Sequence, residues 1–157
     1  MAADSGRELI LEGVKDRLAE ISKARGYGTS PVTVKRELPA AFGELSVGQL
    51  PALFVWDGDE DIEAELSRRV SCVFEVEVRG IVYEPAGGSK ELNRLIRDVK
   101  KALLQATYLD IGAWESDKGH AERVWVSHIT CHADRASRQA MFISTVRVEY
   151  REPMTLS

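Results

Sequence analysis

The chain has 157 residues, of which 44% are hydrophobic and 29% are charged, and its formal net charge is −4 at pH 7. A chain of this length buries roughly 70% of its unfolded surface, so we expect one domain over residues 1–157 that needs no disulfide or metal to fold. The acidic balance argues against a protein that binds nucleic acid by neutralising phosphates, because such proteins usually carry a basic surface. It is compatible with a local patch that contacts DNA, or with an acidic hole through which DNA passes.

The cysteines and the lengths of the apolar runs also restrict the class of protein and its compartment. Cys72 and Cys131 lie in predicted strands, and we expect both to be free, half-buried thiols in a reducing compartment. No apolar run approaches the roughly 20 residues of a membrane span. The first residues lack the basic and apolar regions of a signal peptide, so we expect synthesis in the cytoplasm.

The first predicted element is an amphipathic helix from Ser5 to about Ala24. Ser5 and Glu8 have the spacing of a capping box, and Gly26 and Gly28 are expected to end the helix. The apolar stripe, about 100° wide, consists of Ile10, Leu11, Val14, Leu18 and Ile21. The two glycines do not indicate a phosphate loop, because such a loop follows a strand and opens a helix.

Two strands are predicted next, at Val32–Arg36 and Leu50–Trp56, with a connection between them over residues 38–49. The apolar run at the centre of the second strand indicates burial on both faces, or a strand that ends against a partner.

A sharp change of composition follows, which we interpret as a solvated acidic loop. Its six carboxylates are Asp57, Asp59, Glu60, Asp61, Glu63 and Glu65. Asp57, Asp59 and Asp61 match positions 1, 3 and 5 of a calcium loop. That loop needs Gly at position 6 and Glu at position 12, where this chain has Ile62 and Arg68, so we expect no metal site. The functional alternative is that several copies of the loop line a surface, facing a lumen or a partner, where negative charge matters.

The stretch from Ser67 to Glu84 alternates with the period of a strand. Its apolar face carries Val70, Cys72, Phe74, Val76 and Val78, and its other face carries Glu75, Glu77 and Arg79. A strand usually has about five or six residues, so this one is long. Gly80 is expected to mark a bend or bulge beyond which the strand leaves the sheet and projects.

A second amphipathic helix is predicted from Ser89, a favourable N-cap, to about Thr107. Opposite its apolar stripe are four basic residues within about 60° of one another, namely Lys90, Arg94, Arg97 and Lys101. The simpler interpretation is a solvated helix face. The alternative is a subunit interface that meets the acidic loop, or contact with another partner.

The chain ends with a loop over residues 108–119 and two strands, Arg123–Ala133 and Gln139–Arg151, joined by a hairpin loop over residues 134–138. His128 and His132 share a strand face but lie about 13 Å apart, and Cys131 points to the other face. These three residues cannot bind one zinc ion at about 2.0–2.3 Å. No nucleophile motif is present either, so we expect no catalytic residue, no metal and no cofactor.

The order of elements predicts an α+β fold. It consists of a mixed, mainly antiparallel sheet of four to five strands, with two helices packed on one face.

The chain resembles the tail terminator proteins of long-tailed bacteriophages and prophages, which are also called tail completion or minor tail proteins. The resemblance covers about Leu9 to Pro153. It rests on the initial helix, the segment Leu50-Pro-Ala-Leu-Phe-Val with the acidic residues after it, the long strand, the second helix and the last strand pair.

This resemblance implies a structural protein of the virion tail, assembled in the host cytoplasm, and not an enzyme. The implied assembly is a homo-oligomeric, hexameric ring that caps the tail tube, stops tube polymerisation and offers the surface for head attachment. The implied partners are the tail tube protein and a head-completion or neck protein, with DNA only passing through the ring and no membrane contact.

Three alternatives stay open. Head–tail connector or neck proteins also form rings of small subunits. A small α+β enzyme would use His128 or the aspartates at Asp57–Asp61. A third alternative is an oligomeric interaction module outside any virion.

Overall fold

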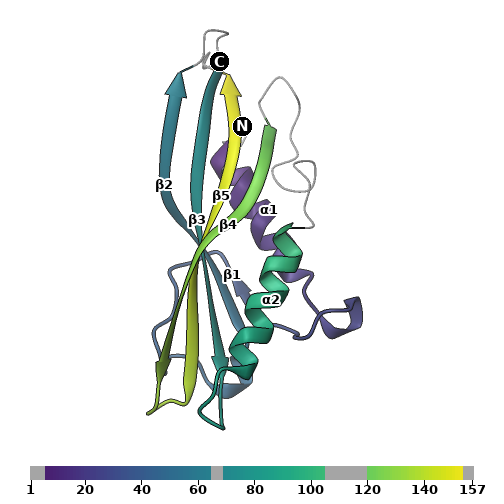
Figure 1. Cartoon of the computed structure of the whole chain (residues 1–157), viewed down its shortest axis with the longest axis vertical. Coiled ribbons are helices and arrows are strands. Elements are labelled where there is room, and N and C mark those ends of the chain that lie inside the picture. The colour runs from purple at the N-terminus through teal and green to yellow at the C-terminus, as the bar shows by residue number, and fades with distance from the viewer. Residues whose placement is uncertain (1–5, 65–68, 105–119, 154–157) are drawn as a thin grey trace.

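The computed structural model describes residues 6–64, 69–104 and 120–153. The elements in chain order are α1 (Gly6–Ala19), the 3₁₀ helix η1 (Lys23–Arg25), β1 (Thr33–Lys35), the 3₁₀ helix η2 (Val47–Gln49), β2 (Ala52–Ala64), β3 (Arg69–Tyr83), α2 (Lys90–Leu104), β4 (His120–Asp134) and β5 (Gln139–Pro153). They form a five-stranded sheet with the order β1-β2-β3-β5-β4 (Figure 1). Only β1 and β2 are parallel. The predicted α+β class and the mixed, mainly antiparallel sheet are therefore confirmed.

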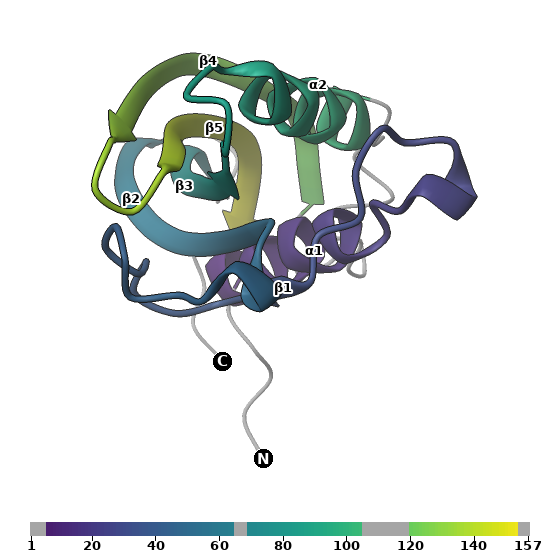
Figure 2. The ribbon, with the colours of Figure 1, turned by 90° about the horizontal axis from the view of Figure 1, so that it is seen from below.

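The two helices divide one face of the sheet between them. Helix α1 contacts β1 and β2, whereas α2 contacts β3, β4 and β5, and the helices contact each other (Figures 1 and 2). The main core lies between these helices and the sheet, and its largest fully buried side chains include Tyr150, Phe74, Phe142 and Leu95. The alternation of β3 accounts for this arrangement, because Cys72, Phe74, Val76 and Val78 all point into that core.

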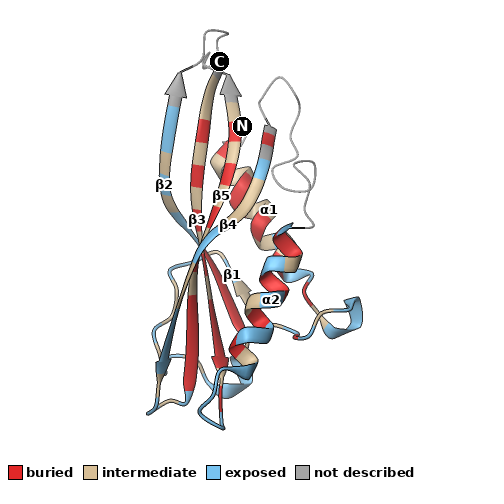
Figure 3. Cartoon of the chain, viewed as in Figure 1, coloured by how far each residue is buried: buried red, intermediate tan, exposed pale blue. Residues whose placement is uncertain are grey.

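The opposite face of the sheet is covered in part by the connection between β1 and β2. Ala40, Phe42 and Leu45 pack there on a second apolar cluster that includes Phe54, Ile81 and Met141. The side chain of Gln139 fixes the connection, because its Oε1 accepts a hydrogen bond from Gly43 N at 2.9 Å and its Nε2 donates to Leu45 O at 3.1 Å. The expected burial of the second strand on both faces is thus confirmed for the half of β2 near Phe54, and Figure 3 shows buried residues concentrated in the lower part of the sheet.

The long strand does not leave the sheet. Each residue of β3 from Arg69 to Tyr83 is paired with β5, so the expected projection beyond Gly80 is wrong. Gly80 lies in regular pairing with Leu53 and Phe142. A Cβ there would lie 2.3 Å from Phe142 Cε1, so this glycine makes room for an aromatic ring. The register shift occurs instead in β2, between Asp57 and Glu60.

Helix α1 is shorter than predicted. It ends at Ala19, because Ser22 has extended backbone angles (φ −156°, ψ 154°), and Gly26 at φ 88° ends the separate helix η1. The expected capping residue Ser5 lies outside the described residues.

Helix α2 begins at Lys90 as predicted, but its cap differs. The backbone N–H of Leu92 donates to Glu84 Oε1 at 2.8 Å, so a buried carboxylate from the end of β3 replaces the expected Ser89 hydroxyl as the capping acceptor. The hydroxyl of Ser89 accepts from the side-chain amide of Asn93 at 3.3 Å. The predicted last turn of this helix and the loop over residues 108–119 lie outside the described residues.

The last two strands are longer than predicted and form a hairpin. Neither cysteine forms a disulfide, as expected, but Cys72 is buried and Cys131 is exposed, so neither is half-buried as predicted. Among the helices in the described part of the chain, none is long and apolar enough to cross a membrane.

Candidate functional site

The acidic segment is a strand and not a loop. Asp57 and residues 59–63 belong to β2, where Glu60 lies opposite Phe74 and Asp61 opposite Val73 of β3. Backbone pairing with the apolar strand β3 overrides the low strand propensity of these carboxylates. Because β1 pairs only as far as Phe54, β2 is an edge of the described sheet beyond that residue. The carboxylates therefore lie along a sheet edge.

A bulge interrupts this edge at residues 58 and 59. Two residues of β2 separate the pairs Asp57–Val76 and Glu60–Phe74, where β3 contributes only Glu75. A Cβ at Gly58 would lie 2.5 Å from the carbonyl oxygen of Glu75, so only glycine allows this close approach of the two backbones. Asp59, the other bulge residue, is exposed.

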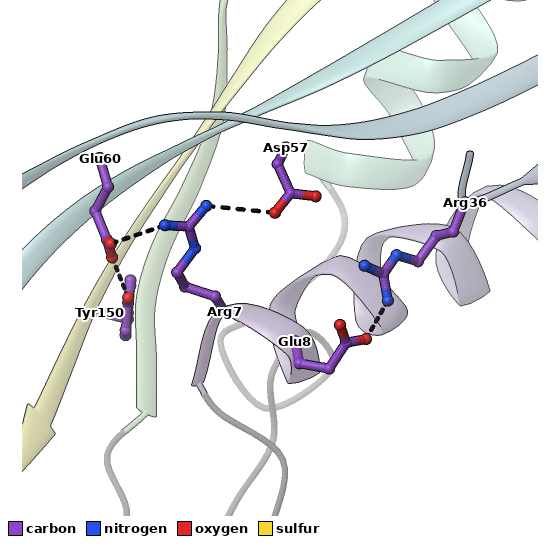
Figure 4. Close-up of polar contacts among 6 residues, drawn as sticks. All are labelled: Arg7, Glu8, Arg36, Asp57, Glu60 and Tyr150. Carbon is purple, nitrogen blue, oxygen red and sulfur yellow. Dashed lines mark hydrogen bonds and ion pairs between the residues drawn. The ribbon is translucent and has the colours of Figure 1, made fainter. Parts of the chain in front are cut away.

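Two of the carboxylates have partners inside the molecule. Arg7, in the first turn of α1, contacts Asp57 Oδ2 at 3.3 Å and Glu60 Oε2 at 3.5 Å (Figure 4). Its guanidinium lies 4.4 Å from the centre of the Phe74 ring. The hydroxyl of Tyr150 donates to Glu60 (Figure 4). Asp57 and Glu60 thus attach the start of α1 to the edge of the sheet.

The other carboxylates differ. Asp59 and Asp61 are exposed and form no ion pair within the described residues. The side chain of Glu63 and all of Glu65 lie outside what the structure describes. Of the predicted acidic residues, Asp59 and Asp61 are the ones whose described side chains present unpaired charge to the surroundings.

A second ionic cluster holds β1 against α1. Arg36 contacts Glu8 (Figure 4). It also lies 2.8 Å from Glu12 Oε1. The hydrogen bond to Glu8 is the main cause of a raised pKa of Arg36, with a further contribution from Glu12. These charges stabilise the fold and are separate from the candidate surface.

Three basic residues of α2 line a pocket of ≈ 240 Å³ beside the loop after η1. Its lining includes Arg94, Arg97 and Lys101, whereas Lys90 lies outside it. Lys101 Nζ donates to Gly26 O at 3.3 Å and lies 4.9 Å from the centre of the Tyr27 ring. Arg94 contacts Glu91 at 2.8 Å, and Arg97 is exposed without an ion pair in the described part of the chain.

The sequence interpretation missed Asp98, which builds one wall of this pocket. Asp98 is 3% exposed, and its carboxylate accepts hydrogen bonds from Gly28 N at 3.1 Å and from the Thr29 hydroxyl. The loop is thereby fixed against α2. A signal was present, because Asp98 is a carboxylate between Leu95 and Val99 of the apolar stripe.

The acidic edge and the basic pocket lie on opposite flanks of the molecule. Helix α2 packs on β3, β5 and β4, whereas the acidic half of β2 forms the sheet edge on the other side of β3. Both views show β2 on the left and α2 to its right (Figures 1 and 2). The two surfaces therefore do not meet within one chain.

Candidate metal ligands do not cluster among the described residues. No group of three His, Cys, Asp or Glu residues there is placed to hold a metal ion. A pocket of ≈ 390 Å³ lies between the turn after β3 and the β4–β5 turn, but Glu84 in its lining caps α2. Asp134, also in that lining, accepts two hydrogen bonds from Ser137, which lower the pKa of its carboxyl. Both carboxylates, Glu84 and Asp134, thus accept hydrogen bonds that fix the local structure.

No family model and no curated protein matches the sequence. Among solved structures, the fold is similar to that of a chain in the virion of a native gene transfer agent particle, with a TM-score of 0.61 and 15% sequence identity. The alignment covers 95% of this chain and 99% of that chain. The likeness therefore extends over nearly the whole of both chains and shows a shared fold.

Proposed function

We propose that this protein is a structural component of a virion and that it acts in the tail as a terminator. The observation that carries the proposal is the fold likeness, over nearly the full length of both chains, to a chain of a gene transfer agent virion. The resemblance to tail terminator proteins in the order of elements and in the pattern of apolar and charged residues agrees with this proposal. A structural role also fits the described residues, in which Arg7 and Asp98 use their charges to fix neighbouring segments.

In this role residues 1–157 act as one domain in a hexameric ring on the last ring of the tail tube. The ring stops tube polymerisation and presents a surface to a head-completion or neck protein, while DNA passes through its centre. In a ring of this kind each subunit uses two different surfaces for its two neighbours, and the ring closes where the rotation between neighbours completes a full turn. The acidic edge of β2 and the basic pocket on α2 are two such surfaces on opposite flanks.

Deletion of the gene in a particle-producing strain tests the role. A missing terminator is expected to give tails of uncontrolled length without heads in electron micrographs, and expression of the wild-type chain is expected to restore uniform tails. Heads beside unattached tails of normal length would instead indicate the neck or connector role. Normal particles that lack the chain by mass spectrometry would contradict any virion role.

A further inference from the structure

We propose that the pocket formed by Arg94, Arg97 and Lys101 receives Asp59 and Asp61 from the β2 edge of a second copy of this chain. The contact rests on the proposed ring, and it names the two surfaces through which neighbouring subunits meet.

The pocket is suited to carboxylates. Its lining holds three cationic side chains against one carboxylate, Asp98. Both oxygens of Asp98 accept hydrogen bonds from the loop at Gly28 and Thr29, so this group holds the wall of the pocket in place. Arg97 has no ion pair within the described residues, and its guanidinium can bind a carboxylate through two parallel hydrogen bonds.

The β2 edge supplies matching groups. Arg7 compensates Asp57 and Glu60, which leaves Asp59 and Asp61 exposed on a strand with no outer neighbour in the described sheet. Two residues along a strand span about 6.6 Å. One turn of α2 from Arg97 to Lys101 spans about 6 Å. The backbone spacing of the two aspartates is thus close to that of Arg97 and Lys101 on one face of α2.

A second copy is the occupant because the two surfaces lie on opposite flanks of one molecule (Figures 1 and 2). A head-to-tail contact of this kind leaves one free surface at each end of a chain of subunits, and a closed ring satisfies both. Charged side chains on an edge strand also prevent aggregation through strand pairing with other chains. The experiment below separates this role of Asp59 and Asp61 from recognition of a neighbouring subunit.

Two charge-reversed variants test the contact. The acid-reversed variant carries Asp59→Lys and Asp61→Lys, and the base-reversed variant carries Arg94→Glu and Arg97→Glu. Each alone juxtaposes like charges at every interface, so its assembly midpoint is expected to move to at least roughly tenfold higher concentration. An equimolar mixture places opposite charges at every interface of an alternating ring, and it is expected to regain the wild-type mass in size-exclusion chromatography with light scattering.

Matched controls exclude effects of net charge. Lys100→Glu/Arg135→Glu makes the same charge change on exposed residues outside the pocket and outside the predicted basic stripe. Asp16→Lys/Glu44→Lys does the same for exposed carboxylates outside the β2 edge. Both controls are expected to assemble like the wild type, and circular dichroism establishes that every variant is folded.

Four outcomes would overturn the contact. These are normal assembly of either reversed variant, no recovery in the mixture, aggregation instead of dissociation in the acid-reversed variant, and a wild-type chain that stays monomeric at all concentrations.

Intact rings that no longer cap tail tubes would identify the tube protein as the occupant, and intact rings with slowed DNA ejection would place the acidic edge at the lumen. The role in the tail is judged separately by the gene deletion, so a terminator that assembles through other surfaces is distinguishable.

Discussion

Gly80 shows how one missing side chain can determine the packing of a core. The space that its Cβ would occupy is filled by the Phe142 ring, with Leu95 Cδ2 at 3.0 Å from the same point. We predict that Gly80→Ala lowers the free energy of unfolding by about 1–3 kcal/mol, as overpacking of a core usually does. Urea denaturation measures the change.

Two further variants test this explanation. Gly80→Ala/Phe142→Leu is expected to lose less stability than the sum of the two single changes, because the smaller side chain relieves the clash. Gly48→Ala places a Cβ with no atom within 4 Å and is the neutral control. Additive effects of the two core changes would contradict the packing role.

Asp134 provides a prediction about pH. Hydrogen bonds from the Ser137 hydroxyl and N–H lower the pKa of its carboxyl below the ordinary 3.8. Its contribution to stability is therefore present above that ordinary value and is lost as the pH falls through the lower, folded pKa. Ser137→Ala is expected to raise the carboxyl pKa of Asp134 toward 3.8 in an NMR titration, and an unchanged titration would rule out the hydroxyl as the cause.

Among the elements, α2 depends on a carboxylate that belongs to another segment. Glu84 is buried and accepts from Leu92 N at 2.8 Å. We predict that Glu84→Ala lowers the free energy of unfolding by about 0.5–2 kcal/mol, the usual cost of losing a cap. Glu84→Gln keeps an acceptor and is expected to retain most of the stability, whereas Ser89→Ala is expected to change it little. A larger effect of Ser89→Ala in thermal unfolding would reverse the assignment of the cap.

The start of α1 and the outer half of β2 are coupled through Arg7. Removal of this side chain by Arg7→Ala breaks the contacts to Asp57 and Glu60 and the ring contact to Phe74. We predict faster amide hydrogen exchange for residues 57–62 and for the first turn of α1, with little change in β4. The same variant is expected to assemble normally, because it leaves Asp59 and Asp61 in place. Equal acceleration across the whole sheet would indicate global destabilisation instead.

These elements also explain how far the sequence could predict the structure. The fold class could be predicted from the period-two alternation of β3 and from the apolar stripes of both helices. Burial of one face places apolar residues at a regular spacing, which the sequence shows directly. The strand conformation of Asp57–Glu63 was missed, because it results from pairing with β3 and from Arg7, which is 50 residues away from Asp57 in sequence. Likewise, the basic stripe was predicted, but the pocket depends on Asp98 and a loop 70 residues away.

At the scale of the whole molecule, charge separation predicts how assembly responds to salt. Exposed charges are screened over about 10 Å at 0.1 M salt and about 3 Å at 1 M. We predict that higher salt shifts the wild-type chain from the proposed ring of six 17.4 kDa subunits toward smaller species. Light scattering over a concentration series, with negative-stain images of the same samples, provides the measurement. A ring mass that does not change with salt would indicate an apolar interface.

The pairing of Asp57 and Glu60 with Arg7 has a consequence for evolution. Within β2, Asp57 and Glu60 contact Arg7, and in the proposed interface the exposed Asp59 and Asp61 serve recognition, so the two tasks would be carried by different residues. Substitutions at the two exposed aspartates can alter the choice of neighbour with little loss of stability. Related particles that share a cell could in this way acquire mutually exclusive subunits while the underlying fold stays the same.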